Sequence, residues 1–117
     1  MRSSWLLVAL VLSLATAFLQ NAALADFWYW RYPWFDLPMH YLGGLAVSAL
    51  LIAFLERHKP RAFMLLFALV IIGWEVFEYV FGIPREENYA LDTVLDLIIG
   101  SLGALTMYIA ARFSLWR

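Results

Sequence analysis

The sequence contains no cysteine among its 117 residues. Disulfide bonds, thiolate metal ligands and cysteine nucleophiles are therefore excluded. Charged residues are also scarce, at 15% of the chain, and the formal net charge is −1. Because no tract of lysine and arginine stands out, the composition predicts no nucleic-acid partner. The sequence also lacks repeats and flexible linkers, so we expect one domain over residues 1–117.

Apolar residues are what the sequence has in excess. They make up 65% of the chain, and the mean hydropathy is +0.78, whereas soluble domains are roughly 45–50% apolar. A soluble domain of this size does not have enough interior to bury so many large apolar side chains. We therefore predict an integral membrane protein whose main partner is the lipid bilayer.

Four stretches are apolar enough to cross a bilayer, which takes ~20 residues per helix. Because backbone groups in lipid must bond internally, each stretch is expected to be an α-helix. The predicted fold class is all-α, a bundle of four transmembrane helices at roughly residues 5–24, 37–55, 62–81 and 92–113. Residues 26–36 are rich in Trp, Tyr and Phe, and we expect them to form an aromatic interfacial segment.

The first apolar segment has two interpretations. We favour a retained transmembrane helix. The alternative is a cleaved secretory signal, because Arg2, the apolar run from Trp5 and the Ala-Leu-Ala at residues 23–25 are typical of such signals. Either interpretation leaves the remaining helices with the same orientation.

Lysine and arginine are distributed unequally between the two sides of this bundle. If the N-terminus is inside, the cytoplasmic side holds Arg2, Arg57, Lys59, Arg61, Arg112 and Arg117. The outer side then holds only Arg31 and Arg85. Because basic residues are enriched in cytoplasmic loops, we expect both termini to face the cytoplasm, in the inner membrane of a bacterium.

The acidic residues have the opposite distribution, and only Glu56 is expected on the cytoplasmic side. Three pairs of ionisable residues enter the helices: Asp36 with His40, Glu75 with Glu78, and Asp92 with Asp96. Their spacing of three or four residues places each pair on one helix face. At ~1.5 Å rise per residue, His40, Glu78 and Asp96 come to nearly the same depth. We therefore expect three helices to carry acids to one level near the outer face.

Glycine residues continue the same faces deeper into the second and fourth helices. They are Gly43, Gly44, Gly100 and Gly103. Small residues mark places where membrane helices approach closely. The acidic faces are therefore expected to point into the seams between helices and away from lipid.

Several of these residues also have a purely structural interpretation. Asp36 could be the N-cap of the second helix, and Asp92 that of the fourth. Thr93 and Asp96 could instead approximate a capping box. His40 alone could be a buried, hydrogen-bonded histidine. The glutamates resist such an account, because a carboxylate at membrane depth costs ~2.5 kcal/mol or more.

So many carboxylates at one depth must be neutralised by protons, arginines or a metal ion. Arg31 and Arg85 are too few for the whole set. Carboxylates with one imidazole form a hard ligand set that suits a divalent ion such as Zn, Mn, Fe or Mg. We therefore predict a divalent metal site with ligands drawn from Asp36, His40, Glu75, Glu78, Asp92 and Asp96.

Three ordered motifs resemble those of a known family. The motifs are DLPMHYLGG (36–44), WEVFE (74–78) and DTVLDLIIGSLGAL (92–105). They resemble the YjdF-like family of uncharacterised bacterial inner-membrane proteins and, more distantly, VanZ-like membrane proteins. The resemblance covers roughly residues 36–105. The resemblance implies that the acidic residues of these motifs form a site. It implies no reaction, because the YjdF-like family has no established activity to carry over.

Three kinds of function are compatible with such a site. The first is divalent-metal binding, with a metal-dependent hydrolase of a lipid or envelope substrate as its enzymatic form. In that form Glu75, the deepest acid, is the candidate general base. The second is proton or cation handling, which the wholly apolar run of residues 63–73 disfavours. The third is an accessory or scaffold subunit of a homo-oligomer or larger membrane complex, with a buried polar network that fixes helix pairing.

Overall fold

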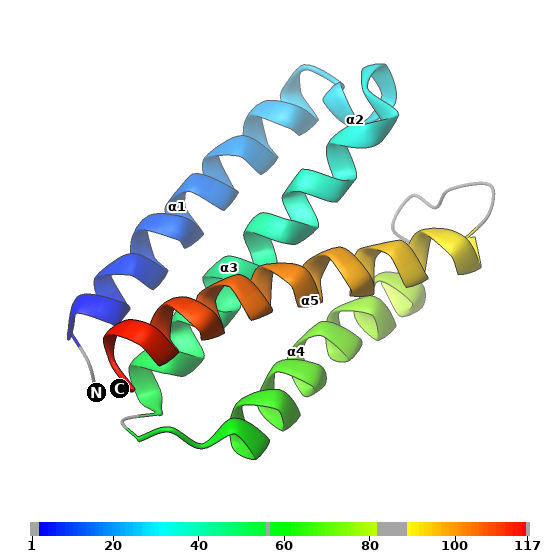
Figure 1. Ribbon diagram of the computed structural model, residues 1–117. Helices are drawn as coiled ribbons and strands as arrows, with labels where there is room; N and C mark the ends of the chain where they lie inside the picture. The colour runs from blue at the N-terminus through cyan, green and yellow to red at the C-terminus, as the bar shows by residue number, and fades with distance from the viewer. Residues whose placement is uncertain (1–2, 56, 82–88, 117) are drawn as a thin grey trace.

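The computed structural model describes residues 3–55, 57–81 and 89–116 (Figure 1). Within these residues all regular secondary structure is helical. Four helices are long and apolar enough to cross a membrane: α1 (Ser3–Ala25), α3 (Asp36–Phe54), α4 (Pro60–Phe81) and α5 (Tyr89–Ser114). The prediction of an all-α chain with four membrane-spanning helices is confirmed.

A compact aromatic connection joins α1 to α3. It contains the short helix α2 (Trp28–Arg31) and the 3₁₀ turn η1 (Pro33–Phe35). Phe27 has a φ of 57°, in the left-handed region, where the chain turns after α1. The rings of this connection pack edge to face, for example Trp28 on Phe35 with centroids 5.4 Å apart. Its position in the headgroup layer stays a prediction.

The starts of α3 and α5 correct the capping interpretations. The N-cap of α3 is Phe35, which makes no side-chain capping bond, and Asp36 is already helical. The α5 helix begins at Tyr89, so Asp92 lies inside its first turn and Asp96 one turn further on. The N-cap interpretations of Asp36 and Asp92, and the capping box at Asp96, are therefore wrong. These carboxylates are not needed to start their own helices.

The central helix of the bundle is α3. It packs along α1 and crosses α5, whereas α4 makes less extensive contacts with α3 and α5. Figure 1 shows α1 and α4 at opposite edges, with α3 and α5 between them. The start of α1 and the end of α5 lie at the same end of the bundle (Figure 1).

Glycine permits the close crossing of α3 and α5. A Cβ atom at Gly44 would overlap the carbonyl oxygen of Gly100, and one at Gly103 would overlap the carbonyl oxygen of Tyr41. The expectation of a glycine seam is thus confirmed at these positions. It is wrong for Gly43, where a Cβ would meet nothing within 4 Å.

The apolar core occupies the end of the bundle where the chain termini lie. Its buried residues are Ile52, Phe63, Phe67, Ala104, Ala111 and Trp116. The α3–α4 connection is anchored there as well, because the ring of His58 lies 2.5 Å from the Tyr108 hydroxyl and packs against Trp116. Tight packing at this end leaves the opposite half of the bundle to form a cavity.

Candidate metal centre

A cavity of about 860 Å³ lies between α1, α3, α4 and α5, in the half of the bundle away from the termini. All six residues that the sequence predicts as metal ligands line it: Asp36, His40, Glu75, Glu78, Asp92 and Asp96. Acids from three helices therefore meet in one space, as their spacing and depth led us to expect. Their role as metal ligands stays a prediction.

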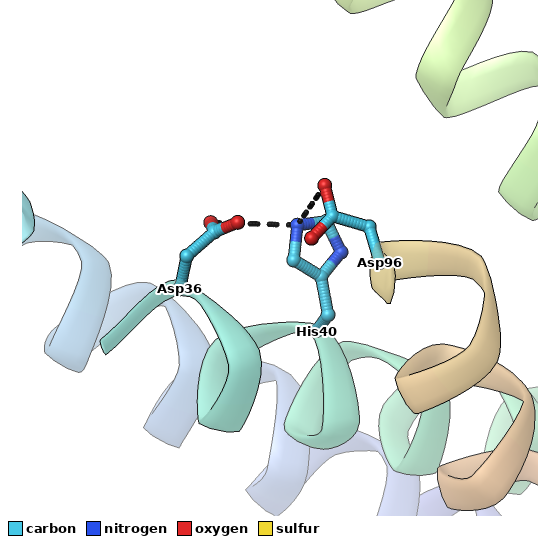
Figure 2. A group of neighbouring side chains, drawn as sticks. All are labelled: Asp36, His40 and Asp96. Carbon is cyan, nitrogen blue, oxygen red and sulfur yellow. Dashed lines mark ion pairs between the residues drawn. The ribbon is translucent and has the colours of Figure 1, made fainter. Parts of the chain in front are cut away.

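Asp36, His40 and Asp96 form the first group of neighbouring ligand atoms (Figure 2). The Nε2 atom of His40 lies 3.4 Å from Asp36 Oδ1 and 3.2 Å from Asp96 Oδ2. Figure 2 shows both carboxylates facing the same ring nitrogen. Asp36 and His40 are one turn apart on α3, and Asp96 comes from α5. The close glycine crossing of these helices therefore sets the separation of the group.

Glu75, Glu78 and Asp96 form the second group. Each offers an oxygen atom within 4.8 Å of the other two. The indole N–H of Trp74 donates a hydrogen bond of 2.7 Å to Glu78 Oε1 and orients that carboxylate. Because Asp96 is a member of both groups, it connects the acids of α4 to those of α3.

Two carboxylate oxygens are buried without a hydrogen-bond partner among the described residues. They are Glu75 Oε2 and Asp96 Oδ1. Only 8% of the surface of Glu75 and 3% of that of Asp96 is exposed. An unsatisfied buried polar atom costs ~1–3 kcal/mol, and more if it is charged. These oxygens are therefore positions where a bound proton or cation would be stabilised.

The cavity carries a large excess of negative charge. Five carboxylates line it, and no lysine or arginine is among the described lining residues. Arg31, one of the two arginines considered for neutralising the acids, pairs instead with the exposed Asp26 at 3.0 Å. Arg85 lies outside the described residues. Within the described part of the chain, His40 is the one side chain of this lining that can carry positive charge.

Asp92 differs from the other five predicted ligands. It lines the same cavity, but it is a member of neither group of neighbouring ligand atoms. Its position one turn before Asp96 places it nearer the start of α5. Its carboxylate therefore contributes negative charge to the cavity from outside the two groups.

The wall that α1 contributes is polar, and sequence reasoning missed it. Ser13, Thr16 and Gln20 line the cavity. Their spacing of three and four residues places them on one helix face. This signal was present in the sequence, but it is weak because hydroxyl and amide groups also occur singly in membrane helices.

Tyr29 of α2 is a second residue that the sequence analysis missed. Its hydroxyl hydrogen-bonds the side-chain oxygen of Gln20, which ties α2 to α1 at the cavity wall. Burial raises the pKa of Tyr29 to about 12, and the negative charges of Asp36 and Glu78 add to the shift. The phenol therefore stays protonated and remains a hydrogen-bond donor at neutral pH.

Four apolar helices around an acidic cavity define a polytopic membrane protein. Over residues 2–117 the chain matches the model of a family described as "Predicted membrane protein (DUF2238)", and it belongs to this family. Searches of curated proteins and of solved structures gave no match. The family description carries neither the YjdF-like nor the VanZ-like name, so those two resemblances stay predictions.

Proposed function

We propose that this protein binds a divalent metal ion in its acidic cavity and that it does so in the inner membrane of a bacterium. The observation that carries the proposal is the convergence of Asp36, His40 and Asp96 on one point. Metal–ligand bonds of ~2.1 Å place neighbouring ligand atoms ~3.0–3.4 Å apart in octahedral or tetrahedral geometry. The separations of 3.2 and 3.4 Å around His40 Nε2 match that spacing.

A buried ion triad without metal is the main structural alternative. A protonated His40 between two carboxylates would also draw Asp36 and Asp96 together. That arrangement neutralises only one negative charge, and it leaves the buried oxygens Glu75 Oε2 and Asp96 Oδ1 without hydrogen-bond partners among the residues that the structure describes. A divalent ion in this group neutralises two negative charges, and the buried Asp96 oxygen without a hydrogen bond is free to coordinate it.

The ligand set limits the identity of the ion. One imidazole with several carboxylates suits Zn, Mn or Fe, whereas Mg prefers a shell of oxygen ligands that includes several waters. Mn, Fe and Zn are therefore favoured over Mg at the position beside His40. Elemental analysis of protein purified without chelator distinguishes among these ions.

The cavity is proposed to open toward the outer side of the membrane. Four described basic residues belong to the end that holds the termini: Arg57, Lys59, Arg61 and Arg112. In the described residues the opposite end holds only Arg31. Basic residues are enriched on the cytoplasmic side, which favours a cytoplasmic position for the termini and an outward position for the cavity.

Metal content tests the proposed function directly. We expect stoichiometric Mn, Fe or Zn in the wild-type protein and a large loss in the His40→Ala/Asp96→Ala variant. The control is Asp26→Ala, which removes an exposed acid outside the cavity. If the wild-type protein holds no stoichiometric metal, and added Mn, Zn or Fe does not raise its Tm, the proposal is wrong.

A second candidate function, metal-dependent hydrolysis of a lipid or envelope substrate, is favoured by the cavity itself. Its volume of about 860 Å³ lies within the ~300–1,000 Å³ range of ligand pockets. Apolar side chains such as Leu24, Trp30 and Val70 line part of it and would suit an acyl or prenyl chain. A bound divalent ion supplies Lewis-acid activation of water, and in this candidate Glu75 would be left uncoordinated and would take the proton.

Filling the cavity tests this candidate. Gly43 lines the cavity, Gly73 does not, and a Cβ at either meets nothing within 4 Å. We expect Gly43→Leu to slow phosphate release from a short-chain phosphatidic acid in micelles, while Gly73→Leu leaves it unchanged. If the metal-loaded wild-type protein releases no phosphate, this substrate is excluded and the metal proposal is unaffected.

Ion transport and a purely structural role receive less support. The apolar core around Ile52, Phe63 and Phe67 lies between the cavity and the end that holds the termini, which disfavours a polar path through the described part of the monomer. An accessory subunit in a homo-oligomer or larger complex would need buried polar residues to fix its helices. It would not need five carboxylates in one cavity.

A further inference from the structure

We propose that the cavity holds two divalent ions that are bridged by the carboxylate of Asp96. This inference rests on the proposed function, because it assumes that the cavity binds divalent metal at all. The first ion would lie in the group Asp36, His40 and Asp96. The second would lie in the group Glu75, Glu78 and Asp96.

The position of Asp96 carries the inference. It comes from α5, the helix that faces both α3 and α4, and it supplies an oxygen to both groups. Its Oδ2 lies 3.2 Å from His40 Nε2. Its Oδ1 is buried and has no hydrogen-bond partner among the described residues. A carboxylate can bridge two ions ~3.5–4 Å apart when one of its oxygens binds the first ion and the other oxygen binds the second.

The second group of acids needs a bound ion of its own. Glu75 is 8% exposed, and its Oε2 has no hydrogen-bond partner in the part of the chain that the structure describes. Its oxygen atom lies within 4.8 Å of those offered by Glu78 and Asp96. An ion held only by the first group would leave this buried carboxylate unsatisfied, at a cost of several kcal/mol for a charged group. A second ion beside Glu75 removes that cost.

The charge of the cavity leads to the same stoichiometry. Five carboxylates line the cavity, and the described lining contains no lysine or arginine. With His40 neutral as a metal ligand, one divalent ion leaves three negative charges uncompensated, and two ions leave one. Buried charge of one sign is strongly unfavourable. The cavity is therefore closer to neutrality with two ions than with one.

The two positions differ in chemistry. The first contains one imidazole nitrogen, whereas the second has only carboxylate oxygens. Imidazole suits Zn and Fe, and an all-oxygen set suits Mn and Mg. The two ions should therefore bind with different affinities. Mn²⁺ is a probe that both positions accept, and it reports on magnetic coupling between neighbouring ions.

Loading metal-free protein with Mn²⁺ tests the inference. We expect two Mn per chain by elemental analysis and an electron paramagnetic resonance spectrum of a spin-coupled pair. Saturation at one Mn, with the six-line spectrum of an isolated ion, would overturn the two-ion inference and leave the proposed function standing. Two Mn without coupling would overturn the bridge. Absence of bound Mn would reject the inference and the proposed function together.

Variants of the unshared ligands assign the two positions. Asp36→Asn affects only the first group and Glu78→Gln only the second, and both residues are partly exposed. Each variant should fall from two Mn to one and lose the coupled spectrum. Asp96→Asn should lose coupling as well, and Asp26→Asn should keep two coupled ions. If Asp36→Asn and Glu78→Gln remain folded and both retain two coupled ions, the inference is wrong.

Discussion

At the scale of single residues, the acids of the cavity carry charge of one sign and do not stabilise one another. Glu75 shows this most clearly, since it is almost fully buried and its Oε2 has no hydrogen-bond partner within the described ranges of the chain. Trp74 orients Glu78 one turn further along α4, but no comparable donor reaches Glu75 Oε2 from the described residues. A charged side chain in this position lowers the stability of the protein unless a proton or a cation neutralises it.

Glu75→Gln should therefore have opposite effects with and without metal. In metal-free protein at pH 8, the substitution removes a buried negative charge beside Glu78 and Asp96, so we expect a higher Tm. With saturating Mn²⁺, the loss of a ligand should lower the Tm relative to wild type and weaken metal affinity ~10-fold or more. Thermal unfolding followed in detergent, with and without Mn²⁺, measures both changes.

The control for this experiment is Asp26→Asn, which removes an exposed acid and should change neither Tm. A lower Tm of Glu75→Gln in both conditions would mean that Glu75 serves packing. A higher Tm in both conditions would mean that it binds no metal.

At the scale of helices, the distance between ligands depends on how closely two helices cross. His40 lies one turn before Gly44 on α3, and Asp96 lies one turn before Gly100 on α5. Gly44 faces the backbone of Gly100 directly. The glycines let the backbones approach, and the ion pair between His40 and Asp96 at 3.2 Å follows from that approach.

A matched pair of glycine substitutions tests this dependence. Gly44→Ala places a methyl group against the Gly100 carbonyl and should force the helices apart, at a cost of ~1–3 kcal/mol. Gly43→Ala adds the same methyl group where nothing lies within 4 Å. We expect Gly44→Ala to lower both the Tm and the metal content, while Gly43→Ala keeps both. Equal effects of the two substitutions would show that the crossing does not control the site.

The sequence predicts these elements unevenly, for physical reasons. Length and apolar content locate the four helices, because the bilayer imposes both. The spacing of the acids predicts their faces. The sequence could not show that Asp36 and Asp92 lie inside their helices and do not cap them, because each helix start depends on where the preceding connection ends. The polar face of α1 and the open position of Gly43 depend on how the helices are rotated against one another, which no local pattern fixes.

At the scale of the whole molecule, charge is separated along the bundle. All described acids except Asp26 line the cavity. Most described basic residues lie at the other end of the bundle, beside the apolar core. The end of the bundle that holds the cavity also carries the aromatic connection, with exposed rings such as those of Phe27 and Trp34. This polarity is typical of a membrane protein with a fixed orientation. It also means that the cavity would draw its cations from one side of the membrane only.

The orientation is testable because the chain has no cysteine, so any cysteine introduced into it is the only one. Asp26→Cys lies in the connection after α1, and Ser114→Cys at the end of α5; both positions are exposed. If the basic end faces the cytoplasm, a membrane-impermeant maleimide should label Asp26→Cys in intact spheroplasts. Ser114→Cys should be labelled only after permeabilisation. The reverse pattern would place the cavity on the cytoplasmic side, where the proposed ion would be taken from the cytoplasm, while the metal-binding proposal itself would stand.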